Sequence, residues 1–366
     1  MIPLIAGSII IFLTFLRFAV ALVNMLSRPR LPMTVSDRSQ LPSLSVLIPV
    51  RNEEKNIGTL LGSLSLLPYR KAEIIVYDDG STDGTEDVVA ACLKVDSRIK
   101  YILGDELPEG WTGKNYACHR LASEASGEYL LFLDADVTVS EDFLRRAVAF
   151  AVRHRLVLLS MFPRQRMRSR GEKIVVPFMF RILLSLLPLF LIRRCRWSSF
   201  SAANGQMMLF RGETYRRYLF HEKVRDRLAE DIEIMRLVKR SRLRGDTLLG
   251  RKELECRMYR SYMEGVNGFS RNILSMFGNS VFFLLLFAVT GLGGWLILLM
   301  LPWQWIASYL FMVVAINAMI AVTIRQRIYE NLLHLLPGIA AFYHIAFLAL
   351  KRNAAKNYEW KGRKIG

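Results

Sequence analysis

The chain has 366 residues, of which 52% are hydrophobic and 22% are charged, and its mean hydropathy is +0.24. This composition is too apolar for an ordinary soluble domain and too rich in charge for a pure membrane bundle, so it predicts a soluble domain joined to membrane segments. The net charge of +18 fits nucleic acid, anionic lipid or phosphorylated substrates. Nucleic acid is the weakest of these three, because the sequence has no zinc-finger spacing and no RNA-binding aromatic pattern. The four cysteines form no C-x-x-C pair, which predicts reduced thiols without a disulfide or zinc site.

The first apolar stretch, residues 2–26, is interrupted by Arg17 and Asn24. About 20 apolar residues are enough to span a bilayer. Arg28 and Arg30 follow directly, and basic residues mark the cytoplasmic end of a span. A cleaved signal peptide would carry its positive charge before the apolar region, so we predict an uncleaved anchor. The predicted boundaries are residues 1–26 for the transmembrane anchor and 27–43 for a proline-containing linker.

From residue 44 onward, short apolar runs alternate with segments of helical spacing. Such alternation with short loops predicts a parallel, doubly wound sheet. Ligands of these sheets bind beyond the carboxyl ends of the strands. The predicted strands are residues 44–48, 73–77, 99–102 and 129–133, and the predicted helices between them are 53–67, 85–94 and 115–126.

A further apolar run, residues 174–192, lies within the part of the chain that we assign to the soluble domain, 44–272. It contains Arg181 and two prolines. A spanning helix here would place the following residues across the membrane from the sheet. We therefore predict that the run lies in the membrane interface and that the whole domain is cytoplasmic.

The C-terminal membrane region is predicted over residues 281–350. Two stretches in it, 281–301 and 303–323, are each long enough to span, with a tight turn at Pro302 between them. A third candidate covers 332–350, but a full span there would put the basic tail, residues 351–366, outside the cell against the positive-inside rule. The sequence leaves open whether this third segment spans or is re-entrant.

Two carboxylates one residue apart, Asp134 and Asp136, follow the predicted strand at 129–133. At a strand exit they can converge on one hard cation. Mg²⁺ bound by one or two carboxylates usually completes its shell with waters and substrate phosphates, so the pair predicts a metal that holds a diphosphate. A solvated acidic turn is the alternative, and it is the commoner explanation for an isolated pair.

Two more polar clusters lie at predicted strand ends. Residues 78–85, D-D-G-S-T-D-G-T, begin with adjacent carboxylates that can accept hydrogen bonds from a base N–H or a ribose hydroxyl. Residues 49–54, P-V-R-N-E-E, open a helix whose backbone N–H groups and dipole suit an anion or a nucleobase carbonyl. The alternatives are a turn with a helix cap for the first cluster and simple N-capping by Asn52 for the second.

In this order, P-x-R-N-E, D-D-G-S-T-D-G-T and D-A-D resemble the motifs of the family 2 glycosyltransferases of the GT-A fold. Residues 110–118, G-W-T-G-K-N-Y-A-C, and 256–259, C-R-M-Y, resemble the membrane-bound branch that glycosylates lipophilic acceptors, such as the diaponeurosporenoate (carotenoid) and hopanoid-associated glycosyltransferases. The resemblance covers roughly residues 44–272 and the flanking membrane segments. It implies a Rossmann-like mixed sheet with N-terminal and C-terminal transmembrane helices. It also implies a nucleotide-sugar donor, for which the family expectation is a uridine nucleotide. The implied metal is Mg²⁺ or Mn²⁺, and the implied acceptor is a carotenoid acid, a hopanoid or another lipid.

The resemblance also implies roles for individual residues. Asp134 and Asp136 would coordinate the Mg²⁺ or Mn²⁺ ion that bridges the donor diphosphate. Trp111 would lie near the sugar or the acceptor. The residues implied to bind the donor are Pro49, Glu53, Asp78, Asp79, Lys114 and Asp134. For Lys114, a solvated lysine at a helix start is the alternative.

An inverting sugar transfer requires a base that takes the acceptor's proton as its oxygen attacks C1. Glu230 and Asp231 open a predicted helix over residues 232–239 and resemble the family's E-D motif. The resemblance implies that Asp231 is the base and that Glu230 lies near the acceptor. An acidic helix N-terminus stabilised by the dipole is the alternative.

Processive polysaccharide synthases carry a Q-x-x-R-W motif after the E-D motif, and this chain has none. Its R-W pair, Arg196-Trp197, comes before Glu230 instead. This departure favours transfer of a single sugar over polymer synthesis, which stays the alternative. Arg257 and Arg260 are candidates for binding the donor diphosphate, because arginine grips phosphate bidentately, or for contacting lipid headgroups. The expected protein is a multi-pass cell-membrane enzyme with no nucleic-acid partner.

Overall fold

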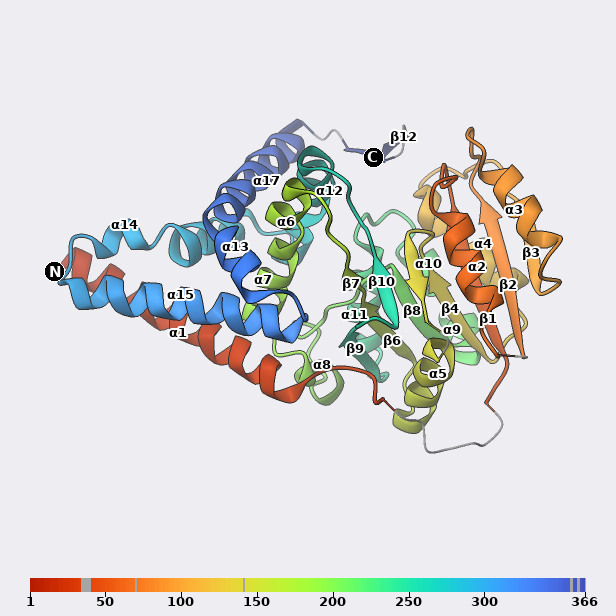
Figure 1. Cartoon of the computed structure of the whole chain (residues 1–366), viewed down its shortest axis with the longest axis horizontal. Coiled ribbons are helices and arrows are strands. Elements are labelled where there is room, and N and C mark those ends of the chain that lie inside the picture. The colour runs from red at the N-terminus through yellow and green to blue at the C-terminus, as the bar shows by residue number, and fades with distance from the viewer. Residues whose placement is uncertain (34–40, 70, 141, 356–357, 361–362, 366) are drawn as a thin grey trace. The chain divides into compact units, whose positions relative to one another are not determined.

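The computed structural model describes all residues except 34–40, 70, 141, 356–357, 361–362 and 366, so part of the predicted linker at 27–43 lies outside the described residues. The chain forms two compact units, each assembled from separate stretches of sequence (Figure 1). The sheet unit comprises residues 29–166, 191–258 and 359–366, and the helical unit comprises 1–28, 167–190 and 259–358. The apolar run at 174–192 thus belongs mostly to the helical unit.

The sheet unit is built on a seven-stranded sheet. In chain order its strands are β1 (Leu44–Val50), β2 (Ala72–Asp78), β3 (Ile99–Leu103), β4 (Tyr129–Leu133), β6 (Leu158–Phe162), β8 (Met207–Arg211) and β9 (Gly245–Leu249). The order across the sheet is β3-β2-β1-β4-β8-β6-β9. The first four strands are parallel, as predicted, whereas β8 is antiparallel to both of its neighbours. The sheet as a whole is therefore mixed, as the resemblance implies.

The predicted alternation of strands and helices is confirmed in the first half of the sheet. The helices there are α2 (Ile57–Ser65), α3 (Thr85–Leu93), α4 (Gly113–Glu124) and α5 (Phe143–His154). All five residues of β4 are buried, which explains why this strand reads as an unbroken apolar run. One face of β1, β2 and β4 packs into a core with α2 and α5, and α4 contacts β1 and β2. A smaller sheet joins β5 (Val137–Val139), β10 (Leu254–Cys256) and β7 (Arg164–Gln165).

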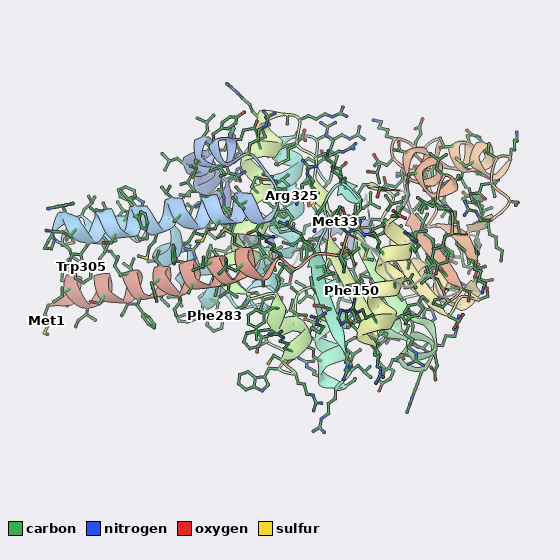
Figure 2. The ribbon with its side chains drawn as sticks, turned by 60° about the horizontal axis from the view of Figure 1, so that its bottom comes forward. Met1, Met33, Phe150, Phe283, Trp305 and Arg325 are labelled. Carbon is green, nitrogen blue, oxygen red and sulfur yellow. The ribbon has the colours of Figure 1, made fainter. Side chains whose placement is uncertain are left out.

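Within the described residues, three helices of the helical unit are long and apolar enough to cross a membrane: α1 (Ile2–Ser27), α15 (Trp303–Thr323) and α17 (Leu335–Ala355). Helices α1 and α15 run side by side (Figures 1 and 2), with Met1 and Trp305 at one end of the pair and Arg325 at the other. Arg28 is the C-cap residue of α1, and Arg325 follows the C-cap residue of α15, so both helices end beside an arginine. This arrangement fits a shared cytoplasmic end for the two helices, which remains a prediction from the positive-inside rule.

The stretch over residues 281–301, which is long enough to span, is not one continuous helix, and its crossing of the membrane stays a prediction. The segment is divided into α13 (Val281–Leu286), the π-helix η1 (Phe287–Leu292) and α14 (Trp295–Leu298). Glycines at 291, 293 and 294 weaken the helix here, at about 1 kcal/mol each relative to alanine. The carbonyl of Gly291 accepts hydrogen bonds from Arg17 Nη1 at 2.9 Å and from the Tyr309 hydroxyl at 3.3 Å. Helix α12 (Tyr262–Met276) meets this region at a bend of 111°, so the two could together make a fourth, broken span.

The apolar run at 174–192 is also divided, into α6 (Arg170–Val175), α7 (Pro177–Leu186) and α8 (Phe190–Arg194). Pro177 begins α7, and the chain turns again before α8, where Asn24 Nδ2 donates to the carbonyls of Leu184 and Leu187 at 2.9 and 2.8 Å. None of these three helices is long enough to cross a bilayer. This agrees with the expectation that the run does not span, and its location in the interface stays a prediction.

Candidate active site

The adjacent carboxylates after β2 are both buried and have different contacts. Asp78 accepts hydrogen bonds from the Ser81 N–H at 2.7 Å and from the Tyr101 hydroxyl at 2.8 Å, which fixes the turn. The Asp79 carboxylate lies 3.9 Å from the Arg51 guanidinium, whose Nη1 also donates to the Asp79 carbonyl. Asp78 thus has a structural role in the loop, and direct contact of either carboxylate with a donor remains a prediction.

The loop after β1 is tied to the loop after β2. Asn52 accepts a hydrogen bond from the Thr82 N–H at 2.8 Å and has a φ of 54°, a left-handed conformation that asparagine tolerates better than most residues. Glu53 accepts a hydrogen bond from Asn56 at 2.7 Å, and its charge adds to the negative field around Asp136. Pro49, within β1, is partly buried and pairs with Tyr77. The predicted nucleotide-binding loops therefore form one connected edge of the sheet.

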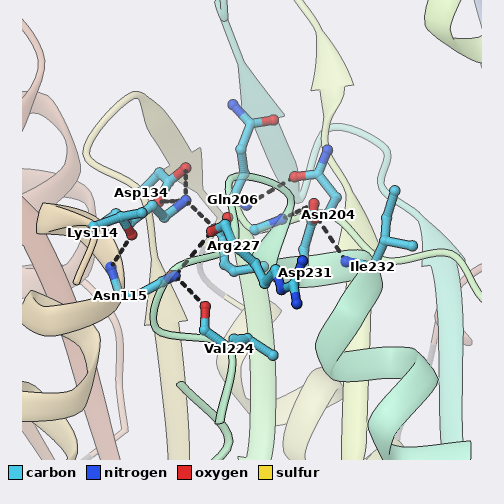
Figure 3. A network of polar contacts seen from close by, with 12 residues as sticks. Lys114, Asn115, Asp134, Asn204, Gln206, Val224, Arg227, Asp231 and Ile232 are labelled. Carbon is cyan, nitrogen blue, oxygen red and sulfur yellow. Dashed lines mark hydrogen bonds and ion pairs between the residues drawn. The ribbon is translucent and has the colours of Figure 1, made fainter. Parts of the chain in front are cut away.

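A lysine from α4 joins the D-x-D segment to the E-D segment (Figure 3). Lys114 Nζ lies 2.9 Å from Asp134 Oδ1 and 3.2 Å from Glu230 Oε1. Burial alone would lower the pKa of Lys114, but the charges of Asp134 and Glu230 raise it well above its usual value. The alternative of a solvated lysine is therefore wrong, because this ammonium is held between two carboxylates at the carboxyl edge of the sheet.

Asp136 is held by two side chains that the sequence did not single out as site residues. Gln206 Nε2 donates to both carboxylate oxygens at 3.0 and 3.2 Å, and the Cys256 thiol donates to Oδ2 at 3.2 Å. Burial and the neighbouring charge of Asp136 raise the pKa of Cys256, which keeps the thiol protonated as a donor. Burial, and then the charge of Asp134, raise the pKa of Asp136 to about 7.

These observations fit a divalent cation at Asp134 and Asp136. The two carboxylates repel each other and share the positive charge of one lysine, so a further cation there would relieve the repulsion. The side-chain amide oxygen of Gln206, Oε1, is buried without a hydrogen-bond partner among the described residues, which leaves an additional hard oxygen nearby. Within the described part of the chain no group of three or more His, Cys, Asp or Glu residues has metal-binding geometry. Two carboxylates are enough for Mg²⁺ when substrate phosphates complete the shell.

Asp231 and Glu230 begin α11 (Glu230–Arg240) but have different surroundings. Glu230 is buried against Lys114, whereas Asp231 is partly exposed and has no ion pair among the described residues. The Asp231 carboxylate accepts hydrogen bonds from the N–H groups of Gly205 at 3.0 Å and Ile232 at 2.7 Å. Burial, and then the charge of Glu230, raise the pKa of Asp231 to about 7. A carboxylate with this pKa and an open side is suited to accept a proton near neutral pH.

The sequence did not reveal the segment Asn204-Gly205-Gln206, which contacts both halves of the site. Because β8 is antiparallel to β4, the start of β8 lies beside the end of β4, with Met207 paired to Leu133. A Cβ at Gly205 would lie 2.8 Å from Glu230 Oε1 and 2.9 Å from Lys114 Nζ, so glycine leaves the room that their ion pair needs. The polar N-G-Q immediately before the apolar run M-M-L-F was the available signal of a strand start at the site.

The N-terminus of α4 also fixes the loop that precedes Glu230. Thr112 caps the helix by accepting a hydrogen bond from the Asn115 N–H. Asn115 Nδ2 donates to the carbonyls of Val224 at 2.8 Å and Arg227 at 3.0 Å (Figure 3). Trp111 packs against Tyr116 and His119, with ring centroids 5.5 and 5.1 Å apart, and is partly exposed. The predicted contact of Trp111 with sugar or acceptor is not tested by this packing.

The two predicted arginines fall in different units. Arg257 follows β10 in the sheet unit and is partly buried. Arg260 is exposed in the helical unit, where its N–H donates to Glu264 at 2.8 Å. Their role in donor binding stays a prediction.

Residues 45–219 match glycosyl transferase family 2. The chain is 38% identical over 106 residues to 4,4'-diaponeurosporenoate glycosyltransferase of Staphylococcus haemolyticus, which is 29% of this chain and 27% of that protein. It is 36% identical over 96 residues to the GalNAc(5)-diNAcBac-PP-undecaprenol beta-1,3-glucosyltransferase of Campylobacter jejuni, covering 26% of this chain and 30% of that protein. The matched region thus spans less than a third of the length of either relative.

Among solved structures, the chain is similar to the mannosyltransferase PcManGT from Pyrobaculum calidifontis, determined in complex with GDP-Man and Mn²⁺. The TM-score is 0.60 at 16% identity, and the match covers 96% of this chain and 100% of that chain. At this identity the likeness shows the fold, which is the GT-A arrangement of a mixed α/β sheet.

Proposed function

Because residues 45–219 belong to glycosyl transferase family 2, we propose that the chain is an inverting glycosyltransferase that moves one sugar from a nucleotide-diphosphate sugar to a lipophilic acceptor at the cytoplasmic membrane face. One observation carries the proposal most directly. Lys114 joins the D-x-D carboxylate Asp134 to Glu230, and the adjacent Asp231 has a raised pKa and an open side. One ammonium thereby links the D-x-D segment to the E-D segment, which carries the proposed base.

Donor binding is assigned to the carboxyl edge of the sheet. Asp134 and Asp136 would hold Mg²⁺ or Mn²⁺, and such an ion neutralises diphosphate charge as the leaving group departs. Lys114 contributes a second, permanent positive charge beside Asp134. Glu53 and the loop that begins at Asp78 would face the nucleoside. We propose a uridine donor, an expectation that comes from the family resemblance.

The proposed chemical step is a single displacement. The acceptor oxygen attacks C1 of the sugar from the side opposite the diphosphate, so the configuration inverts. The bond from C1 to the diphosphate oxygen breaks, and the nucleoside diphosphate departs with the electron pair. Asp231 takes the acceptor's proton in the same step, held in position by the N–H groups of Gly205 and Ile232.

The proposal of a lipid acceptor is supported by two observations. In the part of the chain that the structure describes, three helices are long and apolar enough to cross a membrane, which would keep the enzyme next to lipid substrates. The partial relatives include one named for a carotenoid acid and one named for an undecaprenol-linked sugar. The acceptor class proposed is therefore a carotenoid acid, a hopanoid or another membrane lipid.

Mass spectrometry of lipids from cells with and without the gene tests this proposal. We expect one lipid class to gain the mass of a single sugar when the gene is present. Complementation with Asp231→Asn should not restore this product, whereas Asp226→Asn, which changes an exposed aspartate paired with Arg227, should restore it. A ladder of products with many sugars would instead support the processive polysaccharide synthase, and an unchanged lipid profile would reject a lipid acceptor.

A further inference from the structure

A basic hollow of about 410 Å³ lies in the sheet unit, apart from the residues assigned to sugar transfer. Five residues line this hollow and define the term basic hollow: Arg196, Ser198, Lys239, Arg240 and Arg242. The three arginines are exposed, and the lining contains no carboxylate. A concave surface that presents three exposed arginines and a hydroxyl above a buried lysine has the composition of a phosphate-binding site.

The three arginines of the basic hollow are not neutralised by carboxylates among the described residues. Among the described residues, Arg196, Arg240 and Arg242 form no ion pair, while the nearby carboxylate of Asp246 lies 3.4 Å from Arg193 instead. Lys239 is buried, and its Nζ donates to the carbonyls of Ile192 at 2.5 Å and Cys195 at 2.6 Å. These two bonds join the end of α11 to the segment that carries Arg196.

The position of the hollow on α11 separates it from the proposed sugar-transfer site. Asp231 lies in the first turn of α11 and Lys239 in its last turn. Eight residues of helix correspond to about 12 Å along the axis. The basic hollow is therefore placed to bind a phosphate other than that of the sugar donor.

A lipid source for this phosphate is favoured by the residues around the hollow. Trp197, next to Arg196, is 71% exposed and stacks on Phe200 with ring centroids 6.2 Å apart. Exposed tryptophan beside arginine is typical of membrane–water interfaces, where the indole reaches the headgroup level. The same segment follows directly after the divided apolar run, of which the helices α7 and α8 form the last part.

We propose that the basic hollow binds the phosphate of an anionic phospholipid headgroup and holds this face of the sheet unit against the membrane surface. The arginines and Lys239 supply charge to the phosphate, Ser198 supplies a hydroxyl, and Trp197 inserts among the headgroups. The contact is independent of sugar transfer, so it would hold even if the acceptor were not a lipid.

The test uses the full chain purified in an uncharged detergent. Thermal unfolding is followed with increasing dihexanoyl phosphatidylglycerol, dihexanoyl phosphatidylcholine or inorganic phosphate, because a ligand of the folded state raises the midpoint. We expect stabilisation by phosphatidylglycerol alone at matched concentrations. R196Q/R240Q/R242Q should weaken the apparent affinity by at least about tenfold. The charge-matched control R145Q/R211Q/R217Q, which changes three other arginines that do not line the hollow, should stay within about twofold.

Further variants keep the proposal open to rejection if the triple substitution prevents folding. R240Q and W197A each change one exposed residue and should each weaken phosphatidylglycerol binding. Equal stabilisation by inorganic phosphate and phosphatidylglycerol would overturn the lipid assignment in favour of a free anion. Equal phosphatidylglycerol affinity in the wild type and in the hollow variants would overturn the site itself.

Discussion

The two units of the chain both bury charged or polar side chains, but they satisfy them in different ways. At the carboxyl edge of the sheet, Asp136 and Asp231 have raised pKa values because they are partly buried and lie near other carboxylates. In the helical unit, Arg17 instead donates to the Gly291 carbonyl at 2.9 Å and lies 4.7 Å from the Phe287 ring centroid. Asn24 on the same helix has three hydrogen bonds to backbone groups. The helical unit satisfies these groups with its own backbone, whereas the sheet edge keeps negative charge that a ligand can use.

This difference separates the residues that serve chemistry from those that serve stability. Uncompensated carboxylates cost folding free energy, so their removal should abolish function without destabilising the protein. Removal of a buried donor that satisfies a backbone carbonyl should have the opposite effect. Each prediction below tests one side of this contrast.

The largest effect is expected for Asp231→Asn. Loss of the base should reduce kcat by about 10³-fold, while donor affinity stays unchanged, because Asp231 is assigned to the acceptor's proton. The thermal midpoint at pH 8 should not fall, because a carboxylate with a raised pKa destabilises the native state when it is ionised. Steady-state kinetics, calorimetric donor binding and thermal unfolding provide the three readouts. Full activity in this variant would reject Asp231 as the base.

Asp136→Asn should act on donor binding rather than on proton transfer. We expect wild-type donor affinity to fall when Mn²⁺ is chelated, and the variant to lose at least about tenfold in affinity in the presence of the ion. Asp142→Asn, at an exposed aspartate paired with Arg145, is the matched control and should bind normally. Equilibrium binding of the nucleotide sugar with and without chelator measures the effect. Metal-independent binding by the wild type would contradict a cation at Asp134 and Asp136.

Gly205→Ala should disturb the junction between the two halves of the site. The added Cβ would lie 2.8 Å from Glu230 Oε1 and 2.9 Å from Lys114 Nζ, so their ion pair must shift. We expect a roughly tenfold loss of kcat with little change in stability, because both contacting atoms are the far ends of flexible side chains that can move. Gly62→Ala in α2 is the control, because its Cβ would meet open space and alanine favours helix by about 0.5–1 kcal/mol. Unchanged kinetics for Gly205→Ala would show that the pair is not needed for transfer.

Sequence reasoning found the strand-end clusters because local patterns are enough to place them. The runs before Asp78 and Asp134 are apolar and short, and parallel strands bring their carboxyl ends to one edge. It missed Gly205 and Gln206 because the local N-G-Q pattern marks only a strand start, whereas their position in the site depends on β8 returning antiparallel beside β4. It also missed the break in the helix near Gly291. Hydropathy counts apolar residues and does not reveal that Arg17 donates a hydrogen bond to the Gly291 carbonyl.

The pH dependence tests the raised pKa of Asp231 directly. Because the base must be ionised, kcat/KM should rise about tenfold per pH unit below 7 and level off above it. The stability should change in the opposite direction. In the native state the carboxyl keeps its proton up to about pH 7, whereas the unfolded state releases it near its usual value of 3.8, so stability falls as pH rises between these values. Asp231→Asn should reduce this fall, and an unchanged stability profile in the variant would contradict a raised pKa at this residue.

The smallest effect on catalysis is expected for Arg17→Met, which tests the helical side of the contrast. Methionine keeps the side chain long and apolar but leaves the Gly291 carbonyl with the Tyr309 hydroxyl as its remaining side-chain partner among the described residues. We expect a loss of about 1–3 kcal/mol in stability and a kcat within about twofold of the wild type. Ser8→Ala on the same helix is the control, because its exposed hydroxyl bonds to the Leu4 carbonyl of its own helix. Denaturation of the protein in detergent and its turnover with a soluble acceptor analogue measure the two quantities. If Arg17→Met were as stable as the wild type but inactive, the partly buried arginine of α1 would serve the reaction, and the contrast between the two units would fail.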